Sequence, residues 1–424
     1  MFSLINRKIK RMVLRQQKKR PIVMISDTTL RDGAQMPGIR LEPEHKVQIA
    51  KALAAAGVHS IDCGFPAAGD SEFQGVRAIG KAVKGPVLSA LARTHQGDID
   101  RAAEALSGVS PLKRAITLFI GSSPLHREYK HSMTKSQVID TAAQAIHRAT
   151  KQFEIISFGA EDASRTEPDF LSELYEAAIQ AGAISIGFTD TVGILTPDRA
   201  ADAVRRIQDT VKSMDDAMLG VHFHNDLGMA TANSLACVKA GANIVQGTVN
   251  GIGERAGNVA LEEVVLALTL YPDEYRKRTL VDSTAMYGLS QLVAELTRVY
   301  PMDNKPVVGR NLFRTEAGIH QDGILKNPDT YMPFKPELIG AGPVTLVLGR
   351  HSGRNAVRHH LEMSGMEPTE EHVELVLDYI KTGRHSAGEQ AEIDGFLERL
   401  APFMSDNDLP KPASQNGVPI REPA

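Results

Sequence analysis

The sequence predicts an α/β protein, a (β/α)8 TIM barrel followed by a smaller α+β C-terminal subdomain. Eight short runs rich in β-branched and apolar residues recur at similar spacing, and stretches with apolar residues at steps of three and four separate them. About 30 residues per repeat is the size of a TIM-barrel unit, and a doubly wound sheet normally has fewer strands. The alternation stops near Tyr271. A second unit is therefore expected after the barrel.

The expected strands follow one another along the chain, with a helical stretch after each. Stretches such as residues 42–56 and 167–181 end at or beside a glycine, which is typical of a helix C-terminus. The strands are expected at residues 22–26, 58–63, 86–91, 115–120, 154–158, 184–189, 219–223 and 243–248.

Four segments are expected: a basic tail (1–20), the barrel (21–275), a helical or α+β subdomain (276–404) and a final tail (405–424). The first tail has no acidic residue and lacks the apolar core of a secretory signal, which favours a solvated, partly disordered segment. The last contains four prolines and few apolar residues, which favours disorder.

The composition narrows the function classes. A net charge of −3 argues against nucleic-acid binding, because such surfaces need a basic excess. The apolar runs are too short to span a membrane. Two cysteines, Cys63 and Cys237, suit a reducing compartment. We expect a cytoplasmic protein that acts on small molecules.

Polar residues at the ends of expected strands predict a metal site, because TIM barrels carry their chemistry there. A two-residue step along a strand places His222 and His224 on one face. In a closed barrel the first, seventh and eighth strands are neighbours, so Asp32 can complete the set and Asn258 can add a carbonyl oxygen. Such a mixed set suits Mn²⁺, Mg²⁺, Zn²⁺ or Co²⁺.

A glycine-rich stretch follows the eighth expected strand. Gly251, Gly253 and Gly257 could let the backbone approach a phosphate-bearing ligand such as an acyl-CoA, or could simply form a tight turn. The pattern favours neither interpretation.

Six motifs together resemble the acyl-CoA-dependent alkylmalate synthases, the family of 2-isopropylmalate, citramalate and homocitrate synthases, which perform Claisen-type condensations. The resemblance covers about residues 25–353. The motifs are DTTLRDGAQMPG (27–38), EDASR (161–165), DTVG (190–193), HFHNDLG (222–228), NGIGERAGN (250–258) and GIHQDGILK (318–326).

The resemblance implies a reaction between acetyl-CoA and a 2-oxo acid. A divalent metal on Asp32, His222 and His224 would bind the keto and carboxylate oxygens of the oxo acid, with Arg31 beside the developing negative charge. The resemblance also implies a homodimer, in which the C-terminal subdomain completes the neighbouring barrel site. Candidates for proton transfer are Glu161, His320 and Tyr331, and candidates for binding the oxo acid are Thr191 and Arg165. Thr191 could equally be a packing residue, and His320 a capping histidine in a loop.

Three departures from the family pattern bear on the substrate. Ala34 replaces the usual glutamate of the first motif, Thr117 a common histidine of isopropylmalate synthases, and Thr189 a common proline. Hydroxyls near the pocket disfavour a 2-oxo acid whose side chain is purely apolar. Thr117, Ser157 and Thr189 are expected to contact the far end of an anionic 2-oxo acid, such as 2-oxoglutarate or phosphonopyruvate; 2-oxoisovalerate is the alternative. The chain is short for a leucine-regulated synthase, so feedback inhibition by leucine is not expected.

Two rival classes share the barrel. Acyl-CoA lyases of the 3-hydroxy-3-methylglutaryl-CoA type carry a catalytic cysteine in the loop after the eighth strand, where this chain has Ala256 and Gly257. A non-catalytic metal-binding barrel gains support from Ala34, but the presence of Arg31 and Glu161 argues against it.

Overall fold

The structure is a computed structural model that describes residues 12, 14–382, 393 and 395–398. It contains two compact units. The first extends to Gly309 and includes Ile339–Ala341, and the second holds Arg310–Leu338 and the chain from Gly342 onward. The expected tail at 405–424 lies outside the described residues.

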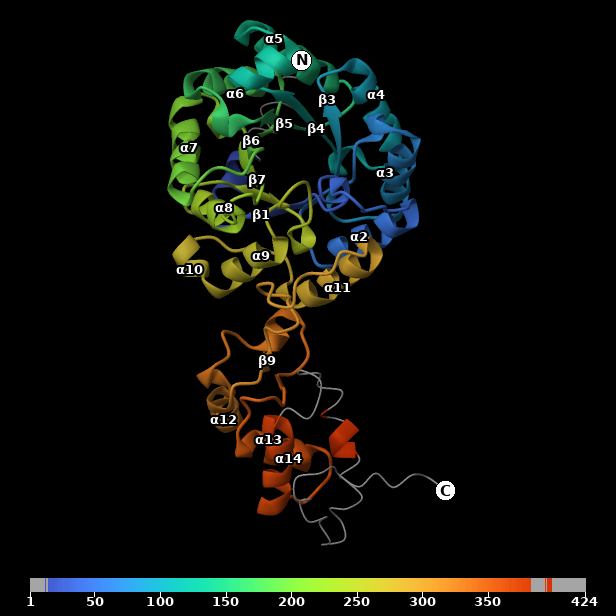
Figure 1. The fold of residues 1–424 in the computed structure, drawn as a ribbon. Coiled ribbons are helices and arrows are strands. Elements are labelled where there is room, and N and C mark those ends of the chain that lie inside the picture. Colours follow the sequence, from blue (N-terminus) through green and yellow to red (C-terminus); the bar gives the residue numbers. More distant parts are fainter. Residues whose placement is uncertain (1–11, 13, 383–392, 394, 399–424) are drawn as a thin grey trace. The chain divides into compact units, whose positions relative to one another are not determined.

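The first unit is a closed barrel of eight parallel strands in the order β1 to β8, which confirms the predicted fold. Each expected strand overlaps one that is present, and Figure 1 shows helices surrounding the strands. The strands are β1 (Met24–Asp27), β2 (Ser60–Asp62), β3 (Val87–Arg93), β4 (Arg114–Gly121), β5 (Ile155–Glu161), β6 (Ser185–Asp190), β7 (Met218–Phe223) and β8 (Ile244–Gly247).

Local sequence signals set the ends of the barrel helices. In α5 the side chain of Thr134 accepts a hydrogen bond from the backbone of Gln137, which begins the helix with a capping box. Helix α6 begins with Pro168 and ends at Gly182, whose φ of 125° suits glycine. The helices are α2 (Pro43–Ala55), α3 (Asp70–Ala82), α4 (Gln96–Ala105), α5 (Lys135–Ala149), α6 (Pro168–Ala181), α7 (Pro197–Thr210), α8 (Ala230–Lys239) and α9 (Leu261–Leu270).

The barrel interior contains a row of three glycines. Gly159 of β5 pairs in register with Gly187 of β6, which pairs with Gly220 of β7. We call these residues the glycine row. TIM-barrel interiors are usually filled by layers of bulky branched side chains. Three neighbouring inward positions without a side chain leave space inside this barrel.

Residues 14–18 of the basic N-terminal segment form a helical turn packed on the barrel. Leu14 is buried, Arg15 pairs with Asp216, and Lys18 donates a hydrogen bond to the carbonyl of Met214. Met214 and Asp216 directly precede β7, so the segment lies at the N-terminal ends of the strands. This part of the predicted tail is therefore ordered, because its apolar face has a surface to cover.

The first unit continues beyond residue 275, the expected end of the barrel segment. After the short helix α10 (Pro272–Tyr275), helix α11 (Met286–Thr297) buries Met286, Leu289 and Val293 in the barrel's own hydrophobic core. This packing places the division between the units after Gly309.

The second unit has its own small core. Strands β9 (Arg314–Thr315) and β10 (Thr345–Leu346) form a parallel pair, beside helices α12 (Gly318–Lys326), α13 (Arg354–Met363) and α14 (Glu370–Thr382). Leu348, Val357 and Val376 are among the residues of that core. Within the described residues of both units, none of the helices has the length and apolarity needed to cross a membrane.

One hydrogen bond joins a covering helix to the glycine row. The buried hydroxyl of Tyr175, on α6, donates to the carbonyl of Gly187 at 2.7 Å. We expect Tyr175→Phe to lower the free energy of unfolding by about 1 kcal/mol, because the ring still packs while the hydrogen bond is lost. Urea denaturation of the two proteins measures this difference, and an unchanged midpoint would show that the bond adds nothing to stability.

Candidate active site

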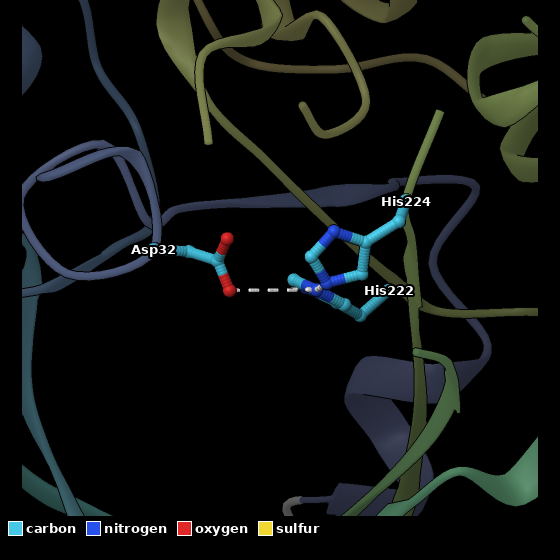
Figure 2. A group of neighbouring side chains, drawn as sticks. All are labelled: Asp32, His222 and His224. Carbon is cyan, nitrogen blue, oxygen red and sulfur yellow. Dashed lines mark hydrogen bonds and ion pairs between the residues drawn. The ribbon is translucent and has the colours of Figure 1, made fainter. Parts of the chain in front are cut away.

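Asp32, His222 and His224 converge at the C-terminal mouth of the barrel (Figure 2). Asp32 lies in the turn after β1, His222 is on β7, and His224 directly follows that strand. The two Nε2 atoms are 3.3 Å apart, and Asp32 Oδ2 lies 3.8 Å from His222 Nε2. Ligands bound to one ion at about 2.1 Å are separated by roughly 3 to 4 Å. The three side chains therefore fit a single divalent cation.

Gln246 of β8 orients His222. Its Oε1 lies 2.8 Å from His222 Nδ1, so that nitrogen carries the proton and Nε2 presents a lone pair. Gln246 and His222 are paired in register across β7 and β8, which fixes this contact through the backbone. Partners of this kind hold metal-binding imidazoles in the required tautomer.

Asn258 supports the carboxylate ligand. Its amide nitrogen donates to Asp32 Oδ1 at 2.7 Å, while its own Oδ1 is buried without a hydrogen-bond partner among the described residues. An unpaired buried carbonyl oxygen beside three ligands is suited to a cation. Gly253 allows this arrangement, because a Cβ there would overlap the Asn258 amide.

Arg31 is held between two buried carboxylates. Its Nη1 lies 2.5 Å from Asp32 Oδ2, and its Nε lies 2.8 Å from Asp62 Oδ2. Burial alone would raise the pKa of Asp32, but the charge of Arg31, with smaller contributions from His222 and His224, holds that pKa well below its usual range. Asp32 is thus a carboxylate, the form a metal binds.

Both histidines are neutral at the mouth of the barrel. Burial lowers the pKa of His222 to about 3 and lowers the pKa of His224 below its ordinary value. Neutral imidazoles and a carboxylate form a donor set that binds Mn²⁺, Zn²⁺ or a similar ion. The donor set thus fits the predicted metal.

Glu161 lies at the end of β5 in a group of basic side chains. Lys130 Nζ contacts both of its carboxylate oxygens at 2.7 Å, and His126 Nδ1 lies 3.6 Å from Glu161 Oε2. Lys130 and His126 belong to a turn of π-helix (His126–His131), a rare element that is frequent at functional sites. Glu161 and Lys130 both line the central cavity.

A cavity of about 680 Å³ runs from the metal ligands into the barrel. Thr117, Ser157, Thr189 and Thr191, which the sequence predicts near the substrate, line this cavity. Arg165 is not among its lining residues, because its guanidinium is bound to the buried Asp162 at 2.8 Å. Gly251, Gly253 and Gly257 also lie outside its lining, in the turn around Asn258. For them an acyl-CoA role remains a prediction.

In the second unit, His320 and Tyr331 lie together. Their rings stack with centroids 4.2 Å apart, and both side chains are exposed. His320 is in helix α12, and the next residue, Gln321, anchors that helix by donating to the carbonyls of Thr315 and Val347. The motif therefore holds His320 exposed on a fixed helix, where its ring stacks on Tyr331 of the following turn.

Three residues of the site were not predicted: Gln246, Asp62 and Lys130. Gln246 reaches the site because β8 pairs with β7 in this register, and Asp62 reaches it because β2 lies beside β1. The sequence alone specifies neither pairing. The inward position of Gln246, two residues before the end of the expected strand, is the one signal that could have indicated it.

Known proteins show the same organisation. Residues 22–293 match the family described as HMGL-like, and residues 307–387 match the homocitrate synthase post-HMGL domain-like family. The chain is 47% identical to the 2-isopropylmalate synthase of Pyrococcus abyssi over 359 residues, which are 85% of this chain and 74% of that protein. It is 45% identical to the 2-isopropylmalate synthase of Oceanobacillus iheyensis, covering 85% of this chain and 69% of that one.

Solved structures share the fold at lower identity. The hydroxymethylglutaryl-CoA lyase from Pseudomonas aeruginosa is 20% identical with a TM-score of 0.56, covering 66% of this chain and 94% of that one. The carboxyl transferase domain of Rhizobium etli pyruvate carboxylase is 16% identical with a TM-score of 0.54, covering 70% of this chain and 51% of that one. The barrel, the metal-ligand geometry and the two sequence matches agree, and the chain belongs to the HMGL-like family, among the acyltransferases that include the 2-isopropylmalate synthases.

Proposed function

We propose that this protein condenses acetyl-CoA with a 2-oxo acid to give a 2-substituted malate and CoA. The convergence of Asp32, His222 and His224 beside Arg31 carries this proposal. The 2-isopropylmalate synthases at 45 to 47% identity support the same reaction class. The motif at residues 250–258 contains no cysteine, which argues against the lyase alternative.

Each residue of the barrel site has a task in this reaction. Asp32, His222 and His224 would hold a divalent cation, which supplies Lewis-acid polarisation of the keto group. Arg31 donates from a fixed position next to Asp32, so its guanidinium can stabilise the negative charge that develops on the keto oxygen. Thr191, whose hydroxyl accepts from the Asp162 amide, lies at the cavity wall, where it would bind the carboxylate.

Removal of a methyl proton from acetyl-CoA needs a positioned base. We assign the proton-transfer groups to Glu161, at the cavity wall, and to the exposed pair His320 and Tyr331. The proposal includes a homodimer, in which the pair from one protomer completes the barrel site of the other. It also places the protein in the cytoplasm, since both cysteines are free and buried.

His320→Ala separates binding from condensation. We expect this variant to bind the oxo acid with unchanged affinity, because the metal ligands remain, while turnover falls by about 10²-fold or more through loss of a proton-transfer group. Calorimetric titration and release of CoA thiol measure the two effects. His359→Ala, in the same unit on α13, is the matched control. Unimpaired turnover in His320→Ala would remove His320 from the mechanism.

The basic residues of the cavity bear on whether the side chain of the 2-oxo acid is charged. Thr117 and Thr189 in the sequence predict an anionic substrate tail. The basic residues that line the cavity are Arg31, Lys113 and Lys130, together with three histidines. Arg31 is bound to Asp32 and Asp62, Lys130 to Glu161, and Lys113 to the carbonyl of Gly85. These contacts favour an uncharged tail, as in 2-oxoisovalerate, over 2-oxoglutarate or phosphonopyruvate.

A thiol-release assay tests the proposal. Purified protein with Mn²⁺ and acetyl-CoA would be offered a panel of 2-oxo acids that includes 2-oxoisovalerate, 2-oxoglutarate, phosphonopyruvate and pyruvate. We expect CoA thiol to appear with at least one of them, and a 2-substituted malate to form in equal amount. No thiol with any oxo acid would overturn the synthase assignment, and cleavage of 3-hydroxy-3-methylglutaryl-CoA would support the lyase instead.

A further inference from the structure

We propose that the glycine row makes the deep part of the cavity a pocket for a 2-oxo acid side chain that is longer than isopropyl, uncharged, and carries a hydrogen-bond acceptor. This inference rests on the proposed condensation and names its substrate class. The residues that carry it are Gly159, Gly187 and Gly220, with His59 and Ser157 as polar neighbours.

The fold does not require glycine at these three positions. A Cβ added to Gly159 would come no closer than 4.0 Å to another atom, and one added to Gly187 or Gly220 no closer than 3.6 or 3.5 Å. These are ordinary van der Waals contacts, and none of the three has a left-handed φ. Because glycine inside a strand costs about 0.5–1 kcal/mol relative to alanine, the gain from the row must lie in the space it leaves.

That space belongs to the cavity. All three glycines line it from the inward faces of β5, β6 and β7, and Gly220 lies two residues before His222 on β7. An isopropyl group fills only a small part of a cavity of about 680 Å³. A longer side chain would extend past the row toward the N-terminal ends of the strands.

The walls facing this space carry four hydroxyls among apolar side chains such as Met218 and Ile244. Ser89 and Thr117 share a hydrogen bond of 2.9 Å, and Ser157 and Ser185 pair in register beside them. All four line the cavity. A wholly aliphatic tail would bury the Ser157 and Ser185 hydroxyls without offering them a partner, which is unfavourable. The lining therefore favours a tail with a polar atom.

His59 supplies a donor at the N-terminal ends of the strands. Its Nδ1 accepts from the backbone amide of Ile25, so the proton is on Nε2. That Nε2 is buried and has no hydrogen-bond partner among the described residues, although His59 lines the cavity. Buried donors are normally paired. An acceptor oxygen on the substrate tail would pair with it.

The charges in the cavity exclude an anionic tail from this pocket. Burial lowers the pKa of His59, which keeps the ring neutral. Arg31 and Lys130 are ion-paired with carboxylates, and Lys113, which donates to the carbonyl of Gly85, is exposed rather than buried beside the glycine row. A carboxylate or phosphonate placed beside the glycine row would be a buried charge without a counter-ion, which is strongly disfavoured.

Four 2-oxo acids test the length, polarity and charge of the side chain that the pocket accepts. The 5-methyl ester of 2-oxoglutarate is long, neutral and polar; 2-oxohexanoate is long and apolar; 2-oxoglutarate is long and anionic; and 2-oxoisovalerate is short. With the full chain and Mn²⁺, we expect kcat/KM to be highest for the ester, by about tenfold or more over 2-oxoisovalerate. A higher value for any of the other three acids would overturn the proposal.

Alanine substitutions test the glycine row itself. We expect Gly159→Ala and Gly187→Ala to lower the ratio of kcat/KM for the ester to that for 2-oxoisovalerate by about tenfold or more, the cost of one misplaced methyl in a pocket. Gly288→Ala, on α11 with open space around it, is the matched control and should leave the ratio unchanged. Ser157→Ala should lower turnover of the ester more than turnover of 2-oxohexanoate.

Failure of the pocket proposal and failure of the synthase proposal give different results in these assays. Thiol release with none of the acids would contradict the reaction class, whereas thiol release with an unaltered ratio in both alanine variants would contradict the pocket alone. Thermal unfolding of each variant checks that the added methyl is accommodated. Titration of the ester into the Mn²⁺-loaded variants, without acetyl-CoA, gives a second measurement that does not depend on turnover.

Discussion

Replacing Asp32 or His222 with alanine is expected to remove the bound metal and to lower turnover by about 10³-fold or more, while the barrel stays folded. The expected loss follows from the geometry, because each side chain offers one of three candidate ligand atoms that lie within 4.8 Å of one another. Lewis-acid stabilisation contributes several kcal/mol, and each 1.36 kcal/mol is about a tenfold change in rate. Elemental analysis of the purified proteins and CoA thiol release measure metal content and turnover.

His147→Ala, on the exposed face of α5, is the control for the histidine variant and should keep both metal and activity. Gln246→Leu gives an intermediate case, because it removes the partner of His222 Nδ1 but no ligand. We expect its metal affinity to fall by about 10- to 100-fold. Full metal content in folded Asp32→Ala or His222→Ala would show that the ion binds elsewhere.

We expect Arg31→Met to reduce both activity and stability. Turnover should fall by about 10²- to 10³-fold, because a positive group beside the developing oxyanion is lost. The free energy of unfolding should fall by about 3–5 kcal/mol, because Asp62 is buried and Arg31 is its ion-pair partner. Thiol release and urea denaturation, both with saturating Mn²⁺, measure these effects.

Arg205→Met is the matched control, since its ion pair with Asp202 is exposed and should contribute less than about 0.5 kcal/mol. The double variant Arg31→Met, Asp62→Leu distinguishes the two roles of Arg31. It should recover stability, because no buried charge is left unpaired at Asp62, but not turnover. Recovery of turnover would mean that Arg31 acts only by neutralising Asp62.

Much of the barrel and its metal ligands could be predicted from local patterns. Strand runs such as 219–223 are short and rich in β-branched and apolar residues, whereas the stretches between them have apolar residues at steps of three and four. The eightfold alternation can therefore be recognised without any knowledge of contacts. The trio of Asp32, His222 and His224 followed from two rules, the two-residue step along a strand and the closure that makes β1, β7 and β8 neighbours.

The rest depends on register and on tertiary packing. Gln246 contacts His222 only because β8 pairs with β7 at that residue. The glycine row cannot be recognised from the sequence alone. Gly159, Gly187 and Gly220 are about 30 residues apart and align only when three strands pair. Helix α11 was expected outside the barrel, and its buried Leu289 and Val293 show that it packs against that core instead.

The ordered turn at residues 14–18 has a consequence for the reaction's chemistry. Leu14 and Gln17 line the same cavity as His222, so this turn covers the end of the cavity opposite the proposed metal ligands. A carbon nucleophile derived from acetyl-CoA is destroyed by protonation whenever bulk water reaches it. A protein trimmed to begin at the first strand would keep every proposed ligand and base. Its barrel would be open to solvent at the N-terminal ends of the strands, and the nucleophile would be short-lived.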